Sequence, residues 1–295
     1  MASSLDSSTI FRVDGIVAVI TGGGSGIGLT MARALASNGA RKVYILGRRL
    51  GVLEKAAEEH ASIIPHQCDV TSKDDLQTAV DRITAEVGYV NLVIANSGSV
   101  GPPARYSPDA SIQELRQTLF TNFSMDAMNE TLHLNITAAF FTMTAFLELL
   151  DAGTKNALQG GFGKPIKKGS DVPSIQSQVI FTTSISAFSR HFSSSPPYLT
   201  SKAAIMQVTK QASSQLARFG IRVNALAPGT SVLTQGRKPE EEAFDDQRFI
   251  PARRFGGDEE MAGAILYLAS RAGSFSNGSI LVTDGGRLSV MSSTY

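Results

Sequence analysis

The chain has 295 residues, of which 42% are hydrophobic and 18% are charged. This composition supports a compact apolar core and excludes a disordered chain. The basic and acidic side chains nearly balance, giving a formal net charge of +1, so the chain lacks the strong field that attracts nucleic acid or anionic membranes. We therefore expect a globular protein with neither a nucleic-acid nor a membrane partner.

The cysteine and the first residues bear on the cellular setting. Cys68 is the single cysteine, which excludes an intrachain disulfide, and it has no Cys or His partner at metal-ligand spacing. We expect a buried thiol, no metal site and a cytoplasmic, reducing environment. Residues 1–10 are rich in serine and lack the apolar stretch of a secretory leader. We expect a flexible tail there and a single domain over residues 11–295.

Short apolar runs alternate with longer helical patterns along the rest of the chain. Most of these runs have almost no polar interruption, as expected for parallel strands covered on both faces. The predicted strands are residues 17–20, 42–46, 63–68, 92–95, 179–182, 222–227 and 279–282. Since the intervening segments are long enough for crossover helices, the pattern predicts an α/β fold: a doubly wound parallel sheet of seven strands flanked by helices.

Helical periodicity follows the first strand and ends at Asn38-Gly39. Further helices are predicted over residues 74–87, 129–150, 198–219 and 259–269. The longest apolar stretch, 136–150, is shorter than the roughly 20 residues needed to span a bilayer, so we expect a buried helix there. Two irregular segments interrupt the alternation: residues 151–178, predicted to be an inserted surface loop, and residues 230–255, predicted to be a lid over the substrate.

A glycine-rich turn joins the first strand to the first helix. It reads Thr21-Gly22-Gly23-Gly24-Ser25-Gly26-Ile27-Gly28. A dinucleotide pyrophosphate requires close backbone approach and a helix N-terminus with free N–H groups, and glycines permit both. The position between strand and helix predicts a cofactor loop. By contrast, Gly160-Gly161-Phe162-Gly163 follows no predicted strand and is expected to be an ordinary loop.

The end of the second strand indicates which cofactor the turn accepts. NAD-binding proteins of this architecture usually place an acidic residue about 20 residues beyond the turn, whereas this chain has Gly47-Arg48-Arg49. Because an arginine can pair bidentately with a 2′-phosphate, the sequence favours NADP(H) over NAD(H). The alternative is a solvated pair of charges at a strand end.

Tyr198 and Lys202 are separated by three residues at the start of a helical pattern, so they lie on one helix face. Free tyrosine titrates near pH ~10, and a neighbouring ammonium is expected to lower the tyrosine pKa enough for proton transfer. Ser184 follows the fifth predicted strand, where its hydroxyl could hold a substrate oxygen. Thr183 and Ser186 compete with it for that role.

Several ordered motifs make the chain resemble the short-chain dehydrogenase/reductase superfamily over nearly its whole length. They are the cofactor turn, Asp69-Val70, Ala95-Asn96-Ser97-Gly98, Tyr198-Leu-Thr-Ser-Lys202, Arg222-Val-Asn224, Pro228-Gly229 and Asp284-Gly285-Gly286. Within that superfamily the chain resembles fungal reductases similar to 3-oxoacyl-carrier-protein reductases and rhamnolipid-type ketoacyl reductases. The resemblance implies a Rossmann-like fold and a homotetramer or homodimer built from the helices containing Asn135 and Lys202.

The resemblance also implies roles for individual residues. It implies a catalytic tetrad of Asn135, Ser184, Tyr198 and Lys202. The cofactor contacts that it implies are Gly22, Gly24, Ser25, Gly26, Ile27, Gly28, Arg48, Arg49, Asp69, Val70, Asn96, Gly98, Tyr198, Lys202, Pro228, Gly229 and Ser231. Candidate substrate contacts are Ser186, Phe188, His191 and Thr230, although a histidine in a serine-rich loop is more often an ordinary surface residue.

The resulting hypothesis is an NADP(H)-dependent oxidoreductase that transfers hydride between the nicotinamide and a carbonyl or secondary alcohol. We expect a ketone reductase of specialised metabolism, acting on a polyketide or terpenoid. Three alternatives stay open: a 3-oxoacyl thioester reductase of the fatty-acid type, a non-redox isomerase, dehydratase or cyclase that reuses the same site, and a regulatory protein that senses NADP(H) without turnover.

Overall fold

The computed structural model describes residues 5–190, 195–229, 238–244, 246 and 249–294. Its centre is one sheet of seven parallel strands in the order β3-β2-β1-β4-β5-β6-β7. The strands are β1 Val17–Thr21, β2 Lys42–Gly47, β3 Ile63–Gln67, β4 Leu92–Ala95, β5 Gln178–Thr182, β6 Arg222–Pro228 and β7 Ile280–Thr283. Every bound lies within one residue of its prediction, and the predicted doubly wound fold is confirmed.

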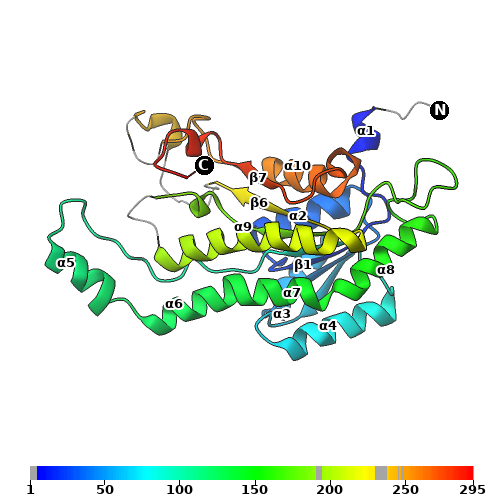
Figure 1. Cartoon of the computed structure of the whole chain (residues 1–295), viewed down its shortest axis with the longest axis horizontal. Helices are drawn as coiled ribbons and strands as arrows, with labels where there is room; N and C mark the ends of the chain where they lie inside the picture. Colours follow the sequence, from blue (N-terminus) through cyan, green and yellow to red (C-terminus); the bar gives the residue numbers. More distant parts are fainter. Residues whose placement is uncertain (1–4, 191–194, 230–237, 245, 247–248, 295) are drawn as a thin grey trace.

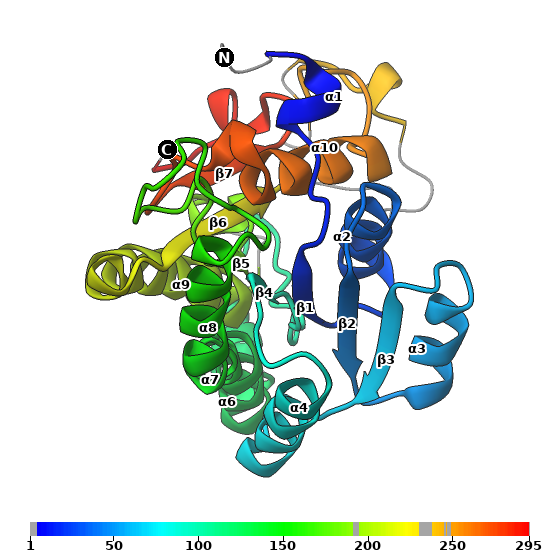
Figure 2. The same ribbon diagram turned by 90° about the vertical axis from the view of Figure 1, so that its right-hand side faces the viewer.

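Helices cover both faces of this sheet (Figures 1 and 2). They are α1 Ser7–Ile10, α2 Gly26–Ser37, α3 Leu50–Ala57, α4 Lys73–Glu86, α5 Ile112–Arg116, α6 Met125–Leu132, α7 Ala138–Ala145, α8 Leu147–Leu158, α9 Pro196–Leu216 and α10 Asp258–Ala269. One apolar core lies between the sheet and α4, α7, α8 and α9. The other lies between the sheet and α2, α3 and α10. The alternate side chains of each strand divide between these two cores.

The structure corrects several predicted boundaries. The single helix predicted over residues 129–150 is a succession of α6, a π-helical turn at His133–Thr137, α7 and α8, with a break at Phe146. Because α8 continues to Leu158, the loop predicted from residue 151 begins eight residues later. The predicted tail contains the short helix α1, which Asp6 caps by accepting from the Ser8 backbone N–H at 2.8 Å. Helix α3 was not predicted.

Within the described residues, no single helix is long and apolar enough to cross a membrane. Residues 125–145 and helix α8 together would be long and apolar enough, but the two segments are bent by 46° relative to each other.

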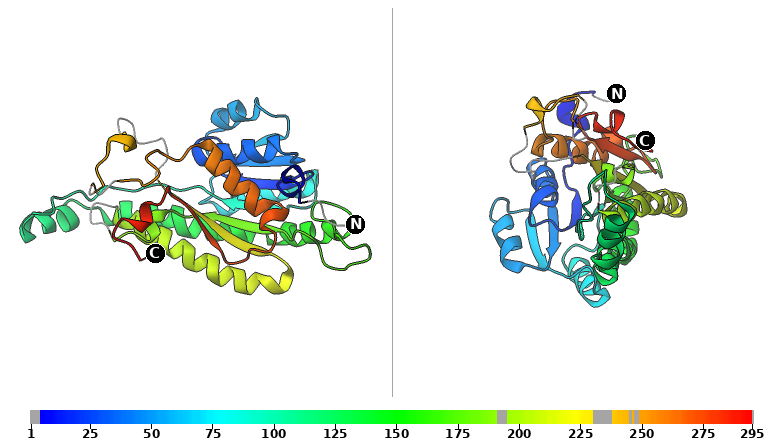
Figure 3. Two further views of the ribbon diagram at one scale, coloured as in Figure 1. Left: turned by 90° about the horizontal axis from the view of Figure 1, so that it is seen from above. Right: turned by 90° about the vertical axis from the view of Figure 1, so that its left-hand side faces the viewer.

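An unpredicted extension leaves the carboxyl end of β4 and returns through α6. This extension, residues 100–130, is called the arm below, and it contains α5 and a π-helical turn at Gln117–Thr121. It projects beyond the rest of the molecule (Figures 1 and 3). The structure describes the whole arm, and Ala104 is its one buried residue. The arm is therefore helical structure without a core of its own.

Arg222 at the start of β6 is a buried cation held by uncharged acceptors. Its Nη1 donates to Gln178 Oε1 at 2.9 Å and to the carbonyl oxygens of Gly273 at 3.1 Å and Ser276 at 3.0 Å. Burial lowers the pKa of this guanidinium to about 10, so it stays protonated at neutral pH. Arg222 thus joins β5 and β6 to the segment that connects α10 with β7.

We expect Arg222→Ala to lower the free energy of unfolding by several kcal/mol, since each buried acceptor left without a partner costs about 1–3 kcal/mol. Urea unfolding measures this loss. The matched control is Arg33→Ala, which removes an exposed ion pair with Glu59 of a kind worth at most about 1 kcal/mol. Equal losses in the two variants would contradict the structural role of Arg222.

Candidate active site

The glycine-rich turn after β1 has the backbone geometry that an anion site requires. Gly22 has φ +66°, and a β-carbon at Gly28 would collide with the Gly22 carbonyl oxygen. The first turn of α2 therefore packs directly against the loop. Ser25 is the N-cap of α2, but its side chain makes no capping hydrogen bond. The free N–H groups of α2 are thus left open to an anionic ligand.

A cleft of about 310 Å³ lies at the carboxyl ends of four neighbouring strands. It is lined from the ends of β1, β2, β3 and β4, on both sides of the point where the strand order reverses. Open α/β sheets bind ligands at this point. The lining residues are Gly22, Gly24, Ser25, Leu46, Gly47, Arg48, Arg49, Val52, Leu53, Cys68, Asp69, Val70, Asn96, Ser97, Gly98 and Leu134.

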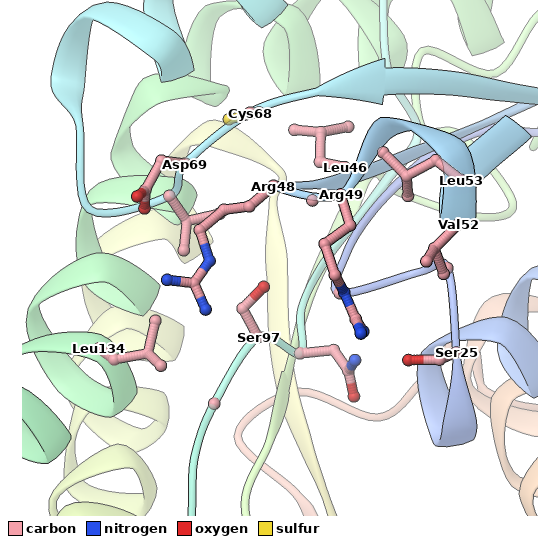
Figure 4. Close-up of a pocket in the computed structure, with 16 residues that line it drawn as sticks. Ser25, Leu46, Arg48, Arg49, Val52, Leu53, Cys68, Asp69, Ser97 and Leu134 are labelled. Atoms are coloured by element: carbon pink, nitrogen blue, oxygen red, sulfur yellow. The ribbon is translucent and has the colours of Figure 1, made fainter.

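Both arginines after β2 point into this cleft (Figure 4). The Arg48 side chain extends from beside Asp69 toward Leu134, and the Arg49 side chain extends toward Ser25. Arg48 is one of the groups that lower the Asp69 pKa, although the hydrogen bonds from Thr71 lower it more. In the described part of the chain no carboxylate forms an ion pair with either guanidinium. The cleft therefore offers two cations to an anion.

Two polar side chains hold the strand ends in place behind the cleft. The backbone N–H groups of Asn96 and Ser97 donate to Thr21 Oγ1 at 2.9 and 3.0 Å. Asn96 also accepts from Thr182 Oγ1 at 3.0 Å. These bonds join the ends of β1, β4 and β5. The sequence pointed to Asn96 but not to Thr21, whose role depends on contacts between distant strands.

Ser184 and Tyr198 meet on the far side of Asn96. Ser184 follows β5, and Tyr198 lies in the first turn of α9. The Ser184 side chain lies within hydrogen-bonding reach of the Tyr198 hydroxyl and lowers its pKa, and Ser184 Oγ accepts from the Ser186 backbone N–H at 3.1 Å. Thr183 is excluded as a competitor because its hydroxyl donates to the Lys202 carbonyl oxygen at 2.7 Å. The geometry thus selects Ser184 as the hydroxyl that faces Tyr198.

Lys202 lies behind this pair, within the protein. Its side chain is buried, and its Nζ donates to the Thr182 carbonyl oxygen at 2.8 Å. The same Nζ is 5.7 Å from the centroid of the Tyr198 ring. Burial raises the Tyr198 pKa, while the Ser184 hydrogen bond lowers it by less. The expectation that Lys202 lowers the Tyr198 pKa is wrong for this structure, because the ammonium faces a backbone carbonyl and burial dominates.

Asn135 lies in the π-helical turn between α6 and α7 and is fully enclosed. Its Oδ1 accepts from the Ser99 backbone N–H at 2.8 Å, and its Nδ2 donates to the Ser99 carbonyl oxygen and to Ser201 Oγ, both at 2.9 Å. Ser201 in turn donates to the Tyr198 carbonyl oxygen at 2.8 Å. Ser201 was missed, although it lies inside the Tyr198–Lys202 motif.

Gly98 connects the cleft to these side chains. It lines the cleft, and a β-carbon placed on it would lie 2.9 Å from Asn135 Oδ1 and 3.5 Å from Lys202 Nζ. A ligand that extends along the cleft past Gly98 thus approaches Asn135 and Lys202 of the predicted tetrad. Pro228 ends β6, and Gly229 donates from its N–H to the Thr283 carbonyl oxygen at 2.8 Å.

The predicted substrate residues are only partly described. Ser186 and Phe188 lie in the short loop after Ser184, whereas His191, Thr230 and Ser231 fall outside the described residues, as does the start of the predicted lid. The C-terminal segment braces this loop. The Arg190 N–H donates to the Ser292 carbonyl oxygen at 3.0 Å, and the Thr294 N–H donates to the Phe188 carbonyl oxygen at 2.8 Å.

The buried lysine gives a prediction for stability against pH. Burial lowers the Lys202 pKa from 10.5 to about 8. Between about pH 8 and 10.5 the unfolded chain therefore holds a proton that the folded chain has lost, so the stability contributed by this group rises with pH across that window. Relative to Lys202→Met, the wild type should gain about 3 kcal/mol between pH 8 and 10.5, at 1.36 kcal/mol per pKa unit.

Urea unfolding of both proteins at several pH values measures this difference. The same comparison at neutral pH should find Lys202→Met at least as stable as the wild type, because the variant removes a desolvated cation. A difference that is independent of pH would contradict the burial of a protonated Lys202.

Comparisons with known proteins agree with this geometry. A family model described as short chain dehydrogenase matches residues 16–158, and one described as enoyl-(acyl carrier protein) reductase matches residues 164–287. The chain is 58% identical to the short-chain dehydrogenase/reductase SAT3 of Stachybotrys chartarum, over 90% of this chain and 100% of SAT3. It is 44% identical to the short-chain dehydrogenase/reductase PhomF of Diaporthe leptostromiformis, over 99% of this chain and 98% of PhomF.

The fold is also similar to that of a solved structure, the RhlG/NADP active-site complex of Pseudomonas aeruginosa. The TM-score is 0.74 at 23% identity, over 94% of this chain and 98% of that one.

Proposed function

Because the chain belongs to the short-chain dehydrogenase/reductase family of oxidoreductases, we propose that it is an NADP(H)-dependent reductase of a ketone, running in reverse as an alcohol dehydrogenase. One observation carries this proposal: Ser184 and Tyr198 lie within hydrogen-bonding reach of each other beside the buried Lys202, and the cleft with the two arginines extends to Gly98, next to Lys202 and Asn135.

The cleft fits a nicotinamide dinucleotide with a 2′-phosphate. The uncapped N-terminus of α2, with Gly22, Gly24, Ser25, Gly26, Ile27 and Gly28, would hold the pyrophosphate. Arg48 and Arg49 would pair with the 2′-phosphate, and Asp69 and Val70 would border the adenine. Asn96, Gly98, Lys202, Pro228, Gly229 and Ser231 would border the nicotinamide and its ribose. When bound, the cofactor supplies the hydride.

The side chains of this protein would then manage the substrate oxygen and its proton. The Ser184 hydroxyl would donate a hydrogen bond to the carbonyl oxygen and fix its direction. The Tyr198 hydroxyl would transfer its proton to that oxygen as the oxygen becomes negative. The Tyr198 phenolate would then take a proton from the buried Lys202 ammonium, and a water ordered by Asn135 would carry a proton from the solvent back to the lysine.

We place the substrate among the ketones of specialised metabolism, as a polyketide or terpenoid. The 58% identity to SAT3 and the 44% identity to PhomF, both from fungi, support this class, and Ser186, Phe188, His191 and Thr230 are the proposed contacts. We further propose a cytoplasmic enzyme, in line with a single cysteine that is buried, and a homodimer or homotetramer built on α7 and α9.

The test is NADPH oxidation against simple ketones, 3-oxoacyl thioesters, cyclic diketones and aromatic polyketide-like carbonyls, with NADH in parallel. We expect turnover of at least one ketone, with NADPH preferred. Turnover restricted to the thioesters would indicate a reductase of the fatty-acid type. Tight NADPH binding without oxidation of any compound would overturn the proposal in favour of an isomerase, dehydratase or cyclase, or of a sensing protein.

A further inference from the structure

The arm, residues 100–130, exposes large apolar side chains, of which Phe120 has Arg116 stacked on its ring. Ile112 is 71% exposed, Phe120 71% and Met125 81%. Scattered apolar residues on a surface are ordinary, but a run of them on one projecting element marks an interaction site. The arm thus presents an apolar surface at one end of the molecule (Figure 1).

The helices of the arm are too short to be stable without a partner surface. Helix α5 with the following π-helical turn covers Ile112 to Thr121, and α6 covers eight residues. Isolated helices shorter than about 12–15 residues are marginal in water, and in proteins packing supplies most of their stability. Helix α6 continues into α7 through the π-helical turn and packs against α9, whereas α5 and the turn that follows it bury no residue, so we expect another molecule to supply the packing of this first part of the arm.

A matching surface lies at the opposite end of the same helical layer. Helices α6 to α8 and α9 run in the same direction along one side of the sheet, with the arm at their start (Figure 1). At their far end Phe219 is 49% exposed and stacks with Arg218. Thr154 of α8 donates to the Gly220 carbonyl oxygen at 3.1 Å. The ends of α8 and α9 therefore form one surface.

The middle of this layer is apolar as well. Helix α7 has no charged residue, and Phe140 on its outer side is 41% exposed and packs edge to face against Phe141. A two-fold axis through this region would pair Phe140 with its equivalent and bring each arm to the far end of the other copy. Such an interface is self-complementary, as a symmetric dimer requires.

The charged residues of the arm and of the far end also favour a second copy of the chain as the partner of the arm. The arm carries two arginines and four carboxylates, which are Arg105, Arg116, Asp109, Glu114, Asp126 and Glu130. The loop 159–177 after α8 carries three lysines and one aspartate, and α9 ends beside Arg218. An acidic arm and a basic far end attract each other between copies. The same negative charge disfavours an anionic membrane as the occupant.

We propose that the arm docks on a second copy of this chain, against the surface formed by Gln215, Arg218 and Phe219 at the end of α9. This inference rests on the proposed homo-oligomer and adds which segments meet. The arm begins beside Ser99, which holds Asn135, and it returns through α6 to the Asn135 turn. Docking of the arm on a second copy would therefore also hold in place its two ends, which lie next to Asn135 of the predicted tetrad.

The first test is the molar mass in solution by light scattering. The chain mass is 31.3 kDa, and we expect the wild type at twice or four times that value. The double substitution Phe120→Asp with Met125→Asp should reduce the measured molar mass to half or less, and Phe219→Asp should have the same effect. The matched control is Phe275→Asp, because Phe275 is fully exposed and lies in neither surface. Circular dichroism of each variant checks that the sheet remains folded.

The second test is cross-linking with a short bismaleimide. The native Cys68 is buried with its pKa raised to about 12, so introduced cysteines are the reactive thiols. A chain with Met125→Cys and Gln215→Cys should cross-link between copies, whereas either substitution alone should not. Efficient cross-linking of Met125→Cys alone would overturn the proposal, because it would place arm against arm.

The outcomes separate this inference from the proposed function. A wild type that is monomeric yet reduces a ketone overturns the arm interface and leaves the reductase standing. An oligomer whose mass is insensitive to all three arm and α9 substitutions also overturns it. A cross-linked oligomer that turns over no ketone supports the interface and contradicts the reductase.

Discussion

Tyr198→Phe is expected to lower kcat by about 10²–10⁴-fold, the contribution that a positioned general acid usually makes. The substitution removes only the hydroxyl that faces Ser184. The aromatic ring can remain half-buried at the start of α9, so the fold and the cofactor cleft should be unaffected. The Kd of NADPH, measured by fluorescence titration, should therefore change little while the turnover is lost.

The matched control for this loss is Tyr267→Phe. Tyr267 lies in α10, where its hydroxyl is 3.4 Å from Ser276 Oγ and distant in sequence and structure from the tetrad. The same chemical change there should leave kcat within experimental error of the wild type. Comparable turnover by Tyr198→Phe and the wild type would show that the proton comes from another group, and the proposed mechanism would be wrong.

Arg48→Ala is expected to weaken NADPH binding about 10- to 150-fold without weakening NADH binding. A hydrogen bond to a charged group is worth about 1.5–3 kcal/mol, and each 1.4 kcal/mol is a tenfold change in Kd. The 2′-phosphate is the part of NADPH that NADH lacks, so only NADPH should respond. Parallel titrations with both cofactors give the ratio of the two Kd values. The same titrations of Arg49→Ala show how much each arginine contributes to NADPH binding.

Arg41→Ala is the control for the cofactor experiment. Arg41 immediately precedes β2, at the opposite end of the strand, and its Nη1 donates to the Tyr89 hydroxyl at 2.9 Å. Its loss should change neither Kd. An equal loss of affinity for NADPH and NADH in Arg48→Ala would mean that Arg48 supports the cleft as a whole, and a wild type that prefers NADH would contradict the proposed cofactor.

The strands were predictable because burial on both faces leaves a local signal. Val17–Thr21 and Gln178–Thr182 are buried at every position, so uninterrupted apolar runs marked them. The glycine turn was predictable for a similar reason, since Gly22 has a positive φ and Gly28 packs against backbone. In both cases consecutive residues must meet the same structural requirement, burial in the strands and a tight turn in the loop, so the local sequence shows it.

The arm and the break at Phe146 were not predictable by the same means. The arm buries only Ala104, so most of its residues carry no burial pattern by which the sequence could mark it. Phe146 is fully buried and looks like a helical core residue in sequence, although α7 ends there. Phe146 packs into the core formed by residues from distant parts of the chain, and sequence periodicity does not report such contacts.

The tetrad shows the same limit on a smaller scale. The spacing of Tyr198 and Lys202 correctly placed them on one helix, but the direction of the ammonium depends on the Thr182 carbonyl of a different element. The link from Asn135 to Ser201 joins residues 66 positions apart. Sequence spacing indicated the candidate reactive groups, whereas their electrostatic surroundings required the structure.

The central claim is that a ketone receives a hydride at this site, and isotopic transfer tests it most directly. The protein is incubated with NADPH deuterated at the reactive carbon of the nicotinamide and with the ketone that the panel identifies, and the product alcohol is analysed by mass spectrometry. The proposed mechanism predicts one deuterium at the former carbonyl carbon, with none transferred by Tyr198→Phe in the same time. With both hydrogens of that carbon replaced by deuterium, an alcohol without deuterium would contradict direct hydride transfer, and a product that is not an alcohol would assign the site to non-redox chemistry.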